Sequence, residues 1–302
     1  MNAYLKAMRL ERWPRSLAIF LGSAAFVFLH RDAPGRFGLE GLAGRSAAAF
    51  LLTWGISTAN YVINEIVDLP TDVHHPTKRF RPLVSGEIRI APFAFLGIAL
   101  TVASLGAAGL IFDWAFFFSL AALLAAGFIY NVRPVRTKDI PFLDAISESA
   151  NNPIRFLIGW FAFAAPGERP PLSMLLCWWA FGNFLMVAKR LSEFRFLKEK
   201  AADYRSSHRR YSRESLLMGM ILSAAISLAA FFYIAFKFKL QTFAVIAPFL
   251  VFFFFLIFRK TLHEAEVMEE PEKLLIRPKY ALYALFLFAL FVLAYFKDAV
   301  GR

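Results

Sequence analysis

The sequence has little cysteine and little charge. Its 302 residues include one cysteine, Cys177, and 19% charged residues, whereas an ordinary soluble domain is about a quarter charged. A single cysteine excludes an intrachain disulfide and a cysteine-rich metal site. The low charge stands beside 59% hydrophobic residues and 36 phenylalanines, which excludes a typical soluble protein and indicates a polytopic membrane protein.

The sequence also lacks a long polar segment and a recognisable leader. The longest polar insert is EFRFLKEKAADYRSSHRRYSRE, residues 193–214, which is too short for a soluble domain and reads as a helical extension. The basic start, MNAYLKAMRLERWPRS, precedes an apolar run that has no small-residue cleavage site, which predicts an uncleaved first helix with an amphipathic lead-in. We therefore expect one polytopic membrane domain over residues 1–302.

Nine segments approach the length of about 20 mostly apolar residues that a spanning helix needs. The first of them is short, and the fifth carries Glu148 and Arg155. The expected fold is an all-α membrane protein with nine transmembrane helices, near 16–30, 46–66, 91–112, 114–131, 143–165, 171–192, 214–236, 242–258 and 280–297.

Lysine and arginine are divided unequally between the two sides that these spans define. One side has 23 of them and the other has 8, and the richer side is normally cytoplasmic. We therefore predict a protein of the bacterial cytoplasmic membrane, with the N-terminus and four loops in the cytoplasm: 67–90, 132–142, 193–213 and 259–279. This bias accounts for much of the net charge of +12, so no nucleic-acid partner is predicted.

The stretch NEIVDLPTDVHHPTKRFRP, residues 64–82, places acids and bases next to each other after the second expected span. Asn64, Asp68 and Asp72 are four residues apart, which places them on one face of a helix. Oxygen donors without thiols suit Mg²⁺, which often bridges carboxylates to substrate phosphates. The cations that follow match phosphate oxygens: Lys78, Arg79 and Arg81.

This stretch leaves alternatives open. Pro70 disfavours helical backbone at the residue before it, so Asp72 belongs either to the helix or to the loop beyond it. The acids and bases also have a purely topological interpretation, in which the acids neutralise a basic cytoplasmic loop. Histidine is a poor ligand for Mg²⁺, and of His74 and His75 the second is the better candidate for a site residue.

Two later stretches repeat the combination. In YNVRPVRTKDIPFLDAISESANNPIRFLIGW, residues 130–160, Asp144 and Glu148 lie four residues apart inside the fifth expected span, where an unpaired ionisable residue is costly and marks a functional site by default. The structural alternative is an ion pair between helices, Glu148 with Arg155 or Asp144 with Lys138. At the end of the sixth span Lys189 and Arg190 precede a basic segment that also fits an interfacial helix on anionic lipid.

These stretches resemble the UbiA superfamily of intramembrane prenyltransferases, from RWPRS at residues 12–16 to EEPEKLLIRP at residues 269–278. HPTKRFRP, residues 75–82, is similar to the branch that includes decaprenyl-phosphate phosphoribosyltransferase. Two residues of the first motif depart from the pattern: Glu65 stands where aspartate is usual, and Val73 where that branch commonly has arginine. In the second motif Asp144 matches the leading acid and Glu148 replaces the closing one.

The resemblance implies a nine-helix bundle with a lipid-facing cavity, whose cytoplasmic end holds the two acidic motifs face to face. It implies Mg²⁺ as cofactor and Asp68, Asp72 and Asp144 as catalytic residues. The implied metal ligands are Asn64, Asp68, Asp72, Asp144 and Glu148. The implied phosphate- and substrate-binding residues are Lys78, Arg79, Arg81, Tyr130, Arg136, Lys138, Lys189 and Arg190.

Two pyrophosphate-releasing transferase reactions follow from the resemblance. The phosphoribosyltransferase branch implies Mg²⁺-dependent transfer of 5-phosphoribose from phosphoribosyl diphosphate to a polyprenyl phosphate, which HPTKRFRP and the 189–193 stretch favour. The alternative moves a polyprenyl group from its diphosphate to an aromatic or other small acceptor, which YNVRPVRTK and the Asp144–Glu148 pair favour. The expected partners are a polyprenyl phosphate or diphosphate lipid, a soluble phosphorylated sugar donor or an aromatic acceptor, and membrane lipids. A transporter explains the intramembrane charges but not metal and phosphate residues beside three spans.

Overall fold

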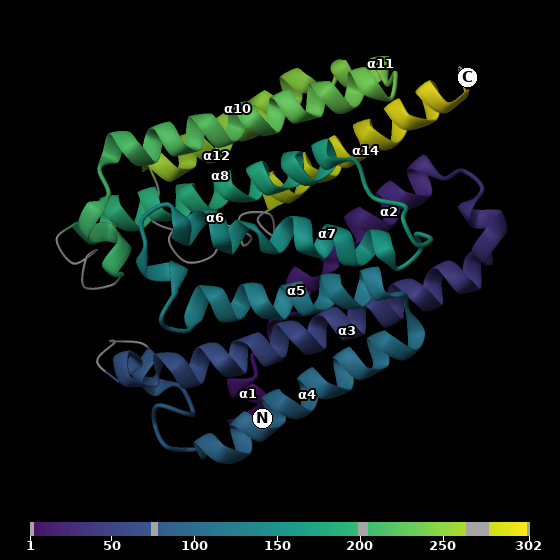
Figure 1. Cartoon of the computed structure of the whole chain (residues 1–302). Coiled ribbons are helices and arrows are strands. Elements are labelled where there is room, and N and C mark those ends of the chain that lie inside the picture. The colour runs from purple at the N-terminus through teal and green to yellow at the C-terminus, as the bar shows by residue number, and fades with distance from the viewer. Residues whose placement is uncertain (1–2, 74–77, 199–204, 264–277, 301–302) are drawn as a thin grey trace. The chain divides into compact units, whose positions relative to one another are not determined.

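The computed structural model describes residues 3–73, 78–198, 205–263 and 278–300, and every regular element within them is helical (Figure 1). The expected all-α class is therefore confirmed. Over these ranges seven helical segments are long and apolar enough to cross a membrane: Ala33–Asp72 (α3), Ile90–Ile111 (α4), Trp114–Asn131 (α5), Leu172–Leu197 (α8), Arg213–Lys237 (α10), Gln241–His263 (α11 and α12) and Pro278–Asp298 in α14.

The segment expected to span at 16–30 is divided. A 3₁₀ helix, η1 (Leu10–Ala18), leads into α2 (Ile19–Leu29), which has only 11 residues. Pro14 lies inside η1, where it has no N–H for the helical ladder. The first expected span is therefore not a continuous α-helix of membrane-crossing length.

The segment expected at 143–165 is also divided, into α6 (Leu143–Ser149) and α7 (Asn151–Phe161). Pro153 stands in the first turn of α7 and has no N–H to donate to the carbonyl of Ser149. The helical ladder stops there and starts again. The expected number of nine transmembrane helices is therefore not confirmed.

Helix α3 carries the first acidic stretch and is longer than expected at both ends. It begins at Ala33, changes direction at Gly38 (φ 66°, ψ 167°) and ends at Asp72. Pro70 lies in its last turn, where the missing N–H costs one hydrogen bond without ending the helix. Of the two positions left open for Asp72, the helical one is confirmed.

The chain forms two compact units. The first comprises Met1–Thr137 and Asn151–Pro170, and the second comprises Lys138–Ala150 and Pro171–Arg302. The first unit contains α1 (Ala3–Ala7), η1, α2, α3, η2 (Lys78–Phe80), α4, α5 and α7. The second contains α6, α8, η5 (Ser206–Arg210), α10, α11 (Gln241–Ala244), α12 (Ala247–His263) and α14 (Pro278–Val300). The expected single domain over 1–302 stays a prediction.

In the first unit the backbones of α2 and α7 touch at two glycines. A Cβ added at Gly22 would lie 1.9 Å from the carbonyl oxygen of Phe156, and one added at Gly159 would lie 1.9 Å from that of Ile19. Ser23 donates a hydrogen bond to the Gly159 carbonyl at 3.1 Å. Small residues permit such close crossings in membrane proteins, so both glycines are structural requirements.

Replacing Gly159 by alanine is expected to lower the free energy of unfolding by about 3 kcal/mol, because the added methyl group meets backbone that cannot rotate away. Unfolding of the purified protein in mixed micelles measures this. Gly106→Ala is the matched control, since a Cβ at Gly106 meets nothing within 4 Å. Equal stability of the two variants would contradict the close crossing.

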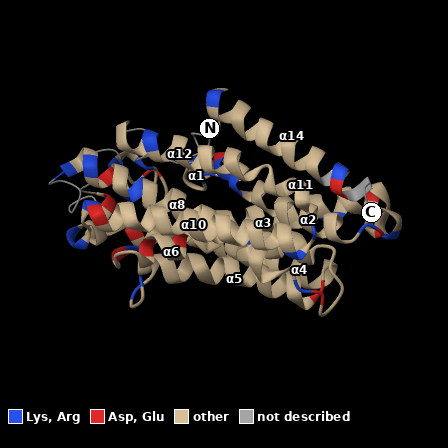
Figure 2. Ribbon diagram, turned by 90° about the horizontal axis from the view of Figure 1, so that it is seen from above, with Lys and Arg blue, Asp and Glu red and all other residues tan. Residues whose placement is uncertain are grey.

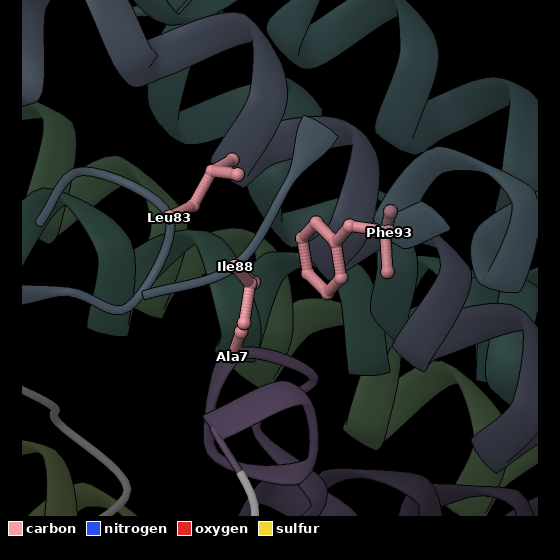
Figure 3. Packing of buried hydrophobic residues seen from close by; sticks show 5 residues of the cluster. Ala7, Leu83, Ile88 and Phe93 are labelled. Carbon is pink, nitrogen blue, oxygen red and sulfur yellow. The ribbon is translucent and has the colours of Figure 1, made fainter. Parts of the chain in front are cut away.

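A small hydrophobic cluster fixes the loop that follows α3. Ala7 of α1, Leu83 and Ile88 of the loop, and Phe93 of α4 form this cluster (Figure 3), together with Val62 of α3. All five side chains are buried. The cluster holds the loop against the two helices, and the basic residues at 78–81 are therefore close to the acidic end of α3.

In the second unit α8 and α10 pack along one another. Asn183 of α8 donates to the Ser223 hydroxyl at 2.9 Å, and the Cys177 thiol donates to the Ser227 carbonyl at 3.4 Å. Both helices are free of acidic and basic residues over most of their length, and these gather towards their ends (Figure 2). The charged residues of α8 therefore belong to one end of the unit.

Candidate active site

The first unit contains a group of three buried acids, Glu65, Asp68 and Asp72, which we call the first acidic cluster. All three lie on α3, at positions i, i+3 and i+7, so they project from one face. Asn64 precedes them on the same helix and is partly exposed. Burial of three carboxylates is costly unless cations neutralise them.

Cations from three segments surround this cluster. Asp72 accepts from Arg81 at 2.5 Å and lies 3.3 Å from the Lys78 ammonium. Asp68 accepts from Arg136 at 3.2 Å. The structure thus places Lys78 and Arg81 beside the acids of the first acidic cluster. It also places Arg136, from the second motif, beside them.

Glu65 and Arg9 complete this arrangement and were not among the predicted site residues. Arg9 donates to Glu65 at 2.8 Å, and Arg81 lies 3.6 Å from the same carboxylate. The sequence does contain a signal that Glu65 is a site residue, because it stands at a motif position where aspartate is usual. Arg79 by contrast is exposed, with its guanidinium 4.8 Å from the ring centre of Phe80.

The first acidic cluster suits Mg²⁺ by donor chemistry. Asp68, Asp72 and Asn64 offer only oxygen donors, and Mg²⁺ often takes one or two protein carboxylates, with water and substrate phosphate completing its shell. The described residues contain no group of three or more His, Cys, Asp or Glu arranged to hold a metal ion. A site that binds Mg²⁺ together with a phosphorylated substrate is consistent with that sparse protein donor set.

The second unit contains the second acidic cluster, Asp144, Glu148 and Glu193, arranged around Arg190. Arg190 is 0% exposed. It donates to Asp144 at 2.8 Å, to Glu148 at 2.7 Å and to both oxygens of Glu193 at 3.2 Å. Glu148 is 26% exposed, whereas the other two acids are buried. Arg190 therefore serves three carboxylates at once.

Residues 205–211, which we call the strap, cover this cluster. Ser207 donates to Asp144 at 3.0 Å, and the Tyr211 hydroxyl donates to the other oxygen of Asp144. His208 Nε2 lies 2.8 Å from Glu193. Burial raises the pKa of Tyr211, and the neighbouring Asp144 carboxylate raises it further, so this hydroxyl stays a donor at neutral pH.

The remaining predicted residues lie as follows. Lys138 is buried, Tyr130 at the end of α5 is partly exposed, and Lys189 on α8 is close enough to Glu148 and Glu193 to interact electrostatically with both. His74 and His75, which the sequence analysis weighed as site residues, lie outside the described residues. Parts of the predicted loops 193–213 and 259–279 also lie outside them.

The structure gives both acids of the second motif a partner other than the two weighed from the sequence. Asp144 and Glu148 both pair with Arg190, and Arg155 lies 3.5 Å from the Ser57 hydroxyl. Tyr211, His208 and Ser207 were not predicted as site residues. Their sequence signal is weak, because SSHRRYS also reads as an amphipathic basic segment.

The sequence model of the UbiA prenyltransferase family matches residues 19–276. The chain belongs to this family. The family match and the seven apolar helices make this UbiA family member an integral, multi-pass membrane protein and a transferase.

Curated relatives are about a quarter identical to it over the aligned residues. The decaprenyl-phosphate phosphoribosyltransferase of Mycolicibacterium smegmatis is 25% identical over 230 residues, which are 74% of this chain and 67% of the relative. The protein of the same name from Corynebacterium glutamicum is 26% identical over 215 residues, 70% of this chain and 60% of the relative. This chain thus spans less than two thirds of the second relative.

A solved structure supports the fold. A UbiA homolog from Archaeoglobus fulgidus, solved with GPP and Mg²⁺ bound, has a TM-score of 0.69 to this UbiA family member at 19% identity. The match covers 95% of this chain and 99% of that chain. The predicted UbiA fold is therefore confirmed over nearly the whole chain.

Proposed function

We propose that this UbiA family member transfers 5-phosphoribose from phosphoribosyl diphosphate to a polyprenyl phosphate and releases pyrophosphate. The observation that carries the proposal is the pairing of Asp72 with Lys78 and Arg81, which brings a carboxylate suited to Mg²⁺ together with cations suited to phosphate. The names of the two curated relatives favour phosphoribose over a prenyl group.

The reaction needs little beyond charge and orientation. A lipid phosphate oxygen forms a bond to the anomeric carbon, the bond from that carbon to pyrophosphate breaks, and the sugar passes through an oxocarbenium-like state. The attacking phosphate is already ionised at neutral pH, so no general base is required. When bound, Mg²⁺ supplies positive charge for the departing pyrophosphate.

The residues of the chain take distinct roles in this proposal. Asp68 and Asp72, with Asn64, hold the cation. Arg81 and Lys78 bind phosphate oxygens, as does the exposed Arg79. Arg136 orients Asp68 through its hydrogen bond, and Lys189 is the candidate for the lipid phosphate. Asp144 and Glu148 as a second metal set, and Tyr130, Lys138 and Arg190 as substrate-binding residues, stay predictions.

The second candidate function is prenyl transfer from a polyprenyl diphosphate to a small acceptor. Two observations favour it. Arg136, from the YNVRPVRTK turn, contacts Asp68, and a solved relative of the same fold was bound to GPP and Mg²⁺. Both candidates release pyrophosphate and use the same acids and bases, so substrate assays have to separate them. In either case we propose a cytoplasmic site, because that side has the excess of Lys and Arg.

The purified full-length protein, given labelled phosphoribosyl diphosphate, a polyprenyl phosphate and Mg²⁺, is expected to move label into the organic phase. Omission of Mg²⁺ should abolish the transfer. A parallel reaction contains labelled polyprenyl diphosphate and an aromatic acceptor such as 4-hydroxybenzoate. Labelled acceptor in this second reaction, with none in the first, would replace phosphoribosyl transfer by prenyl transfer.

A further inference from the structure

The strap contacts two of the three acids of the second acidic cluster. Asp144 accepts four hydrogen bonds: Oδ1 accepts from the Ala145 N–H and the Tyr211 hydroxyl, and Oδ2 accepts from Arg190 and Ser207. A carboxylate has about four lone-pair positions. Asp144 is 0% exposed, and its lone pairs are all used inside the protein.

Tyr211 also fixes the start of the helix that carries Asp144. Its hydroxyl oxygen accepts a hydrogen bond from the Phe142 N–H at 2.7 Å, and the two rings meet edge to face at 5.0 Å. Phe142 precedes α6 and has a φ of 62°, a conformation that bulky residues rarely adopt unless their surroundings impose it. One tyrosine therefore fixes both the carboxylate and the backbone before it.

Glu148, the partly exposed acid of the cluster, is bonded to Arg190. Its guanidinium is oriented by Asp144 on one side and by Glu193 on another, and Glu193 is in turn bonded to His208 of the strap. The remaining nitrogen, Nη2, donates to Glu148 at 2.7 Å. The position of Glu148 thus depends on groups that the strap holds.

We propose that the strap is a positioning element: Ser207, His208 and Tyr211 fix Asp144 and Glu193 around Arg190, and Arg190 holds Glu148 as the acid of this cluster that meets the ligand. The nature of that ligand, a phosphorylated substrate with its Mg²⁺, rests on the proposed function. Asp144 becomes a positioning residue in place of the metal ligand that the family resemblance implied.

The first test is Tyr211→Phe in the full-length protein, with Tyr233→Phe as the matched control because Tyr233 is exposed on α10. Loss of a hydrogen bond to a buried carboxylate is expected to lower kcat for phosphoribosyl transfer about tenfold. The KM for phosphoribosyl diphosphate should stay within about twofold, since a positioning role for Tyr211 involves no contact with the substrate. A tenfold rise in KM with unchanged kcat overturns the proposal, as does wild-type behaviour of the variant.

A second measurement does not depend on activity. Hydrogen exchange of residues 142–149 is expected to be about tenfold faster in Tyr211→Phe than in Tyr233→Phe, because the Phe142 N–H loses its acceptor. Ser207→Ala keeps the contact between Tyr211 and Phe142, so it should speed the exchange less than Tyr211→Phe does. It should also lower kcat, because Asp144 loses one hydrogen bond. Unchanged exchange in Tyr211→Phe overturns the positioning role. Faster exchange in a protein whose wild type transfers no phosphoribose supports the strap and rejects the proposed function.

Discussion

Asp68→Asn is expected to lower the turnover number about 10²–10³-fold, the range seen when one group that stabilises developing charge is removed. Asparagine keeps the size of the side chain and an oxygen that still accepts from Arg136. What it loses is the negative charge that would hold Mg²⁺. Steady-state rates at several Mg²⁺ concentrations measure the effect, and the concentration giving half-maximal rate should also rise.

The matched control for this variant is Asp113→Asn. Asp113 belongs to the same unit and precedes α5, but it is exposed, and its side chain makes no capping hydrogen bond there. Its turnover should stay within about twofold of wild type, as for most surface substitutions. A comparable loss in both variants would point to general destabilisation of the unit. Wild-type turnover in Asp68→Asn would remove the first acidic cluster from the mechanism.

Arg190→Met is expected to lower the free energy of unfolding by about 3–5 kcal/mol, the cost of removing one partner from a buried ion pair. Arg190 is 0% exposed and pairs with three carboxylates. Methionine fills much of the volume but leaves those acids without the guanidinium. Denaturant unfolding in mixed micelles measures the loss, followed by fluorescence of the tryptophans.

Arg209→Ala is the matched control, because Arg209 is an exposed arginine of the strap. It should change stability by less than about 0.5 kcal/mol. Adding Glu193→Gln to Arg190→Met removes one of the acids left behind and should recover part of the stability. A loss below about 1 kcal/mol in Arg190→Met would mean that water or another cation neutralises the cluster in its place.

Local patterns predicted the all-α class and the helical placement of the first acidic stretch. Long apolar runs give helices of membrane-crossing length without further information, and the four-residue spacing of Asp68 and Asp72 correctly placed them on one helical face. The expected helices at 16–30 and 143–165 failed for a local reason as well. Pro153 removes a backbone donor inside the second of these segments and Pro14 does so just before the first, and hydropathy does not register that loss.

The partners of each charge were harder to predict, because they depend on contacts far apart in the sequence. Arg190 lies 46 residues from Asp144, and Arg9 lies 56 residues from Glu65. A place in the sequence gives no distance to a carboxylate, so the sequence alone assigns Arg190 to phosphate binding, through the family resemblance, and Arg9 to an amphipathic start. Tyr211 was missed for the same reason, since its hydroxyl meets Asp144 across 67 residues.

The separation of Asp144 from Arg190 also has a consequence for biosynthesis. Ribosomes add about 5–20 residues per second, so the 46 residues between them take about 2–9 s to make. Tyr211 follows later still. During this interval the insertion machinery has to accommodate the nascent α6 while Arg190 has not yet been synthesised. Asp144 and Glu148 therefore lack the guanidinium that pairs with them in the finished protein. A chain arrested before residue 190 therefore contains the acids of α6 but not the arginine that holds them in the finished protein.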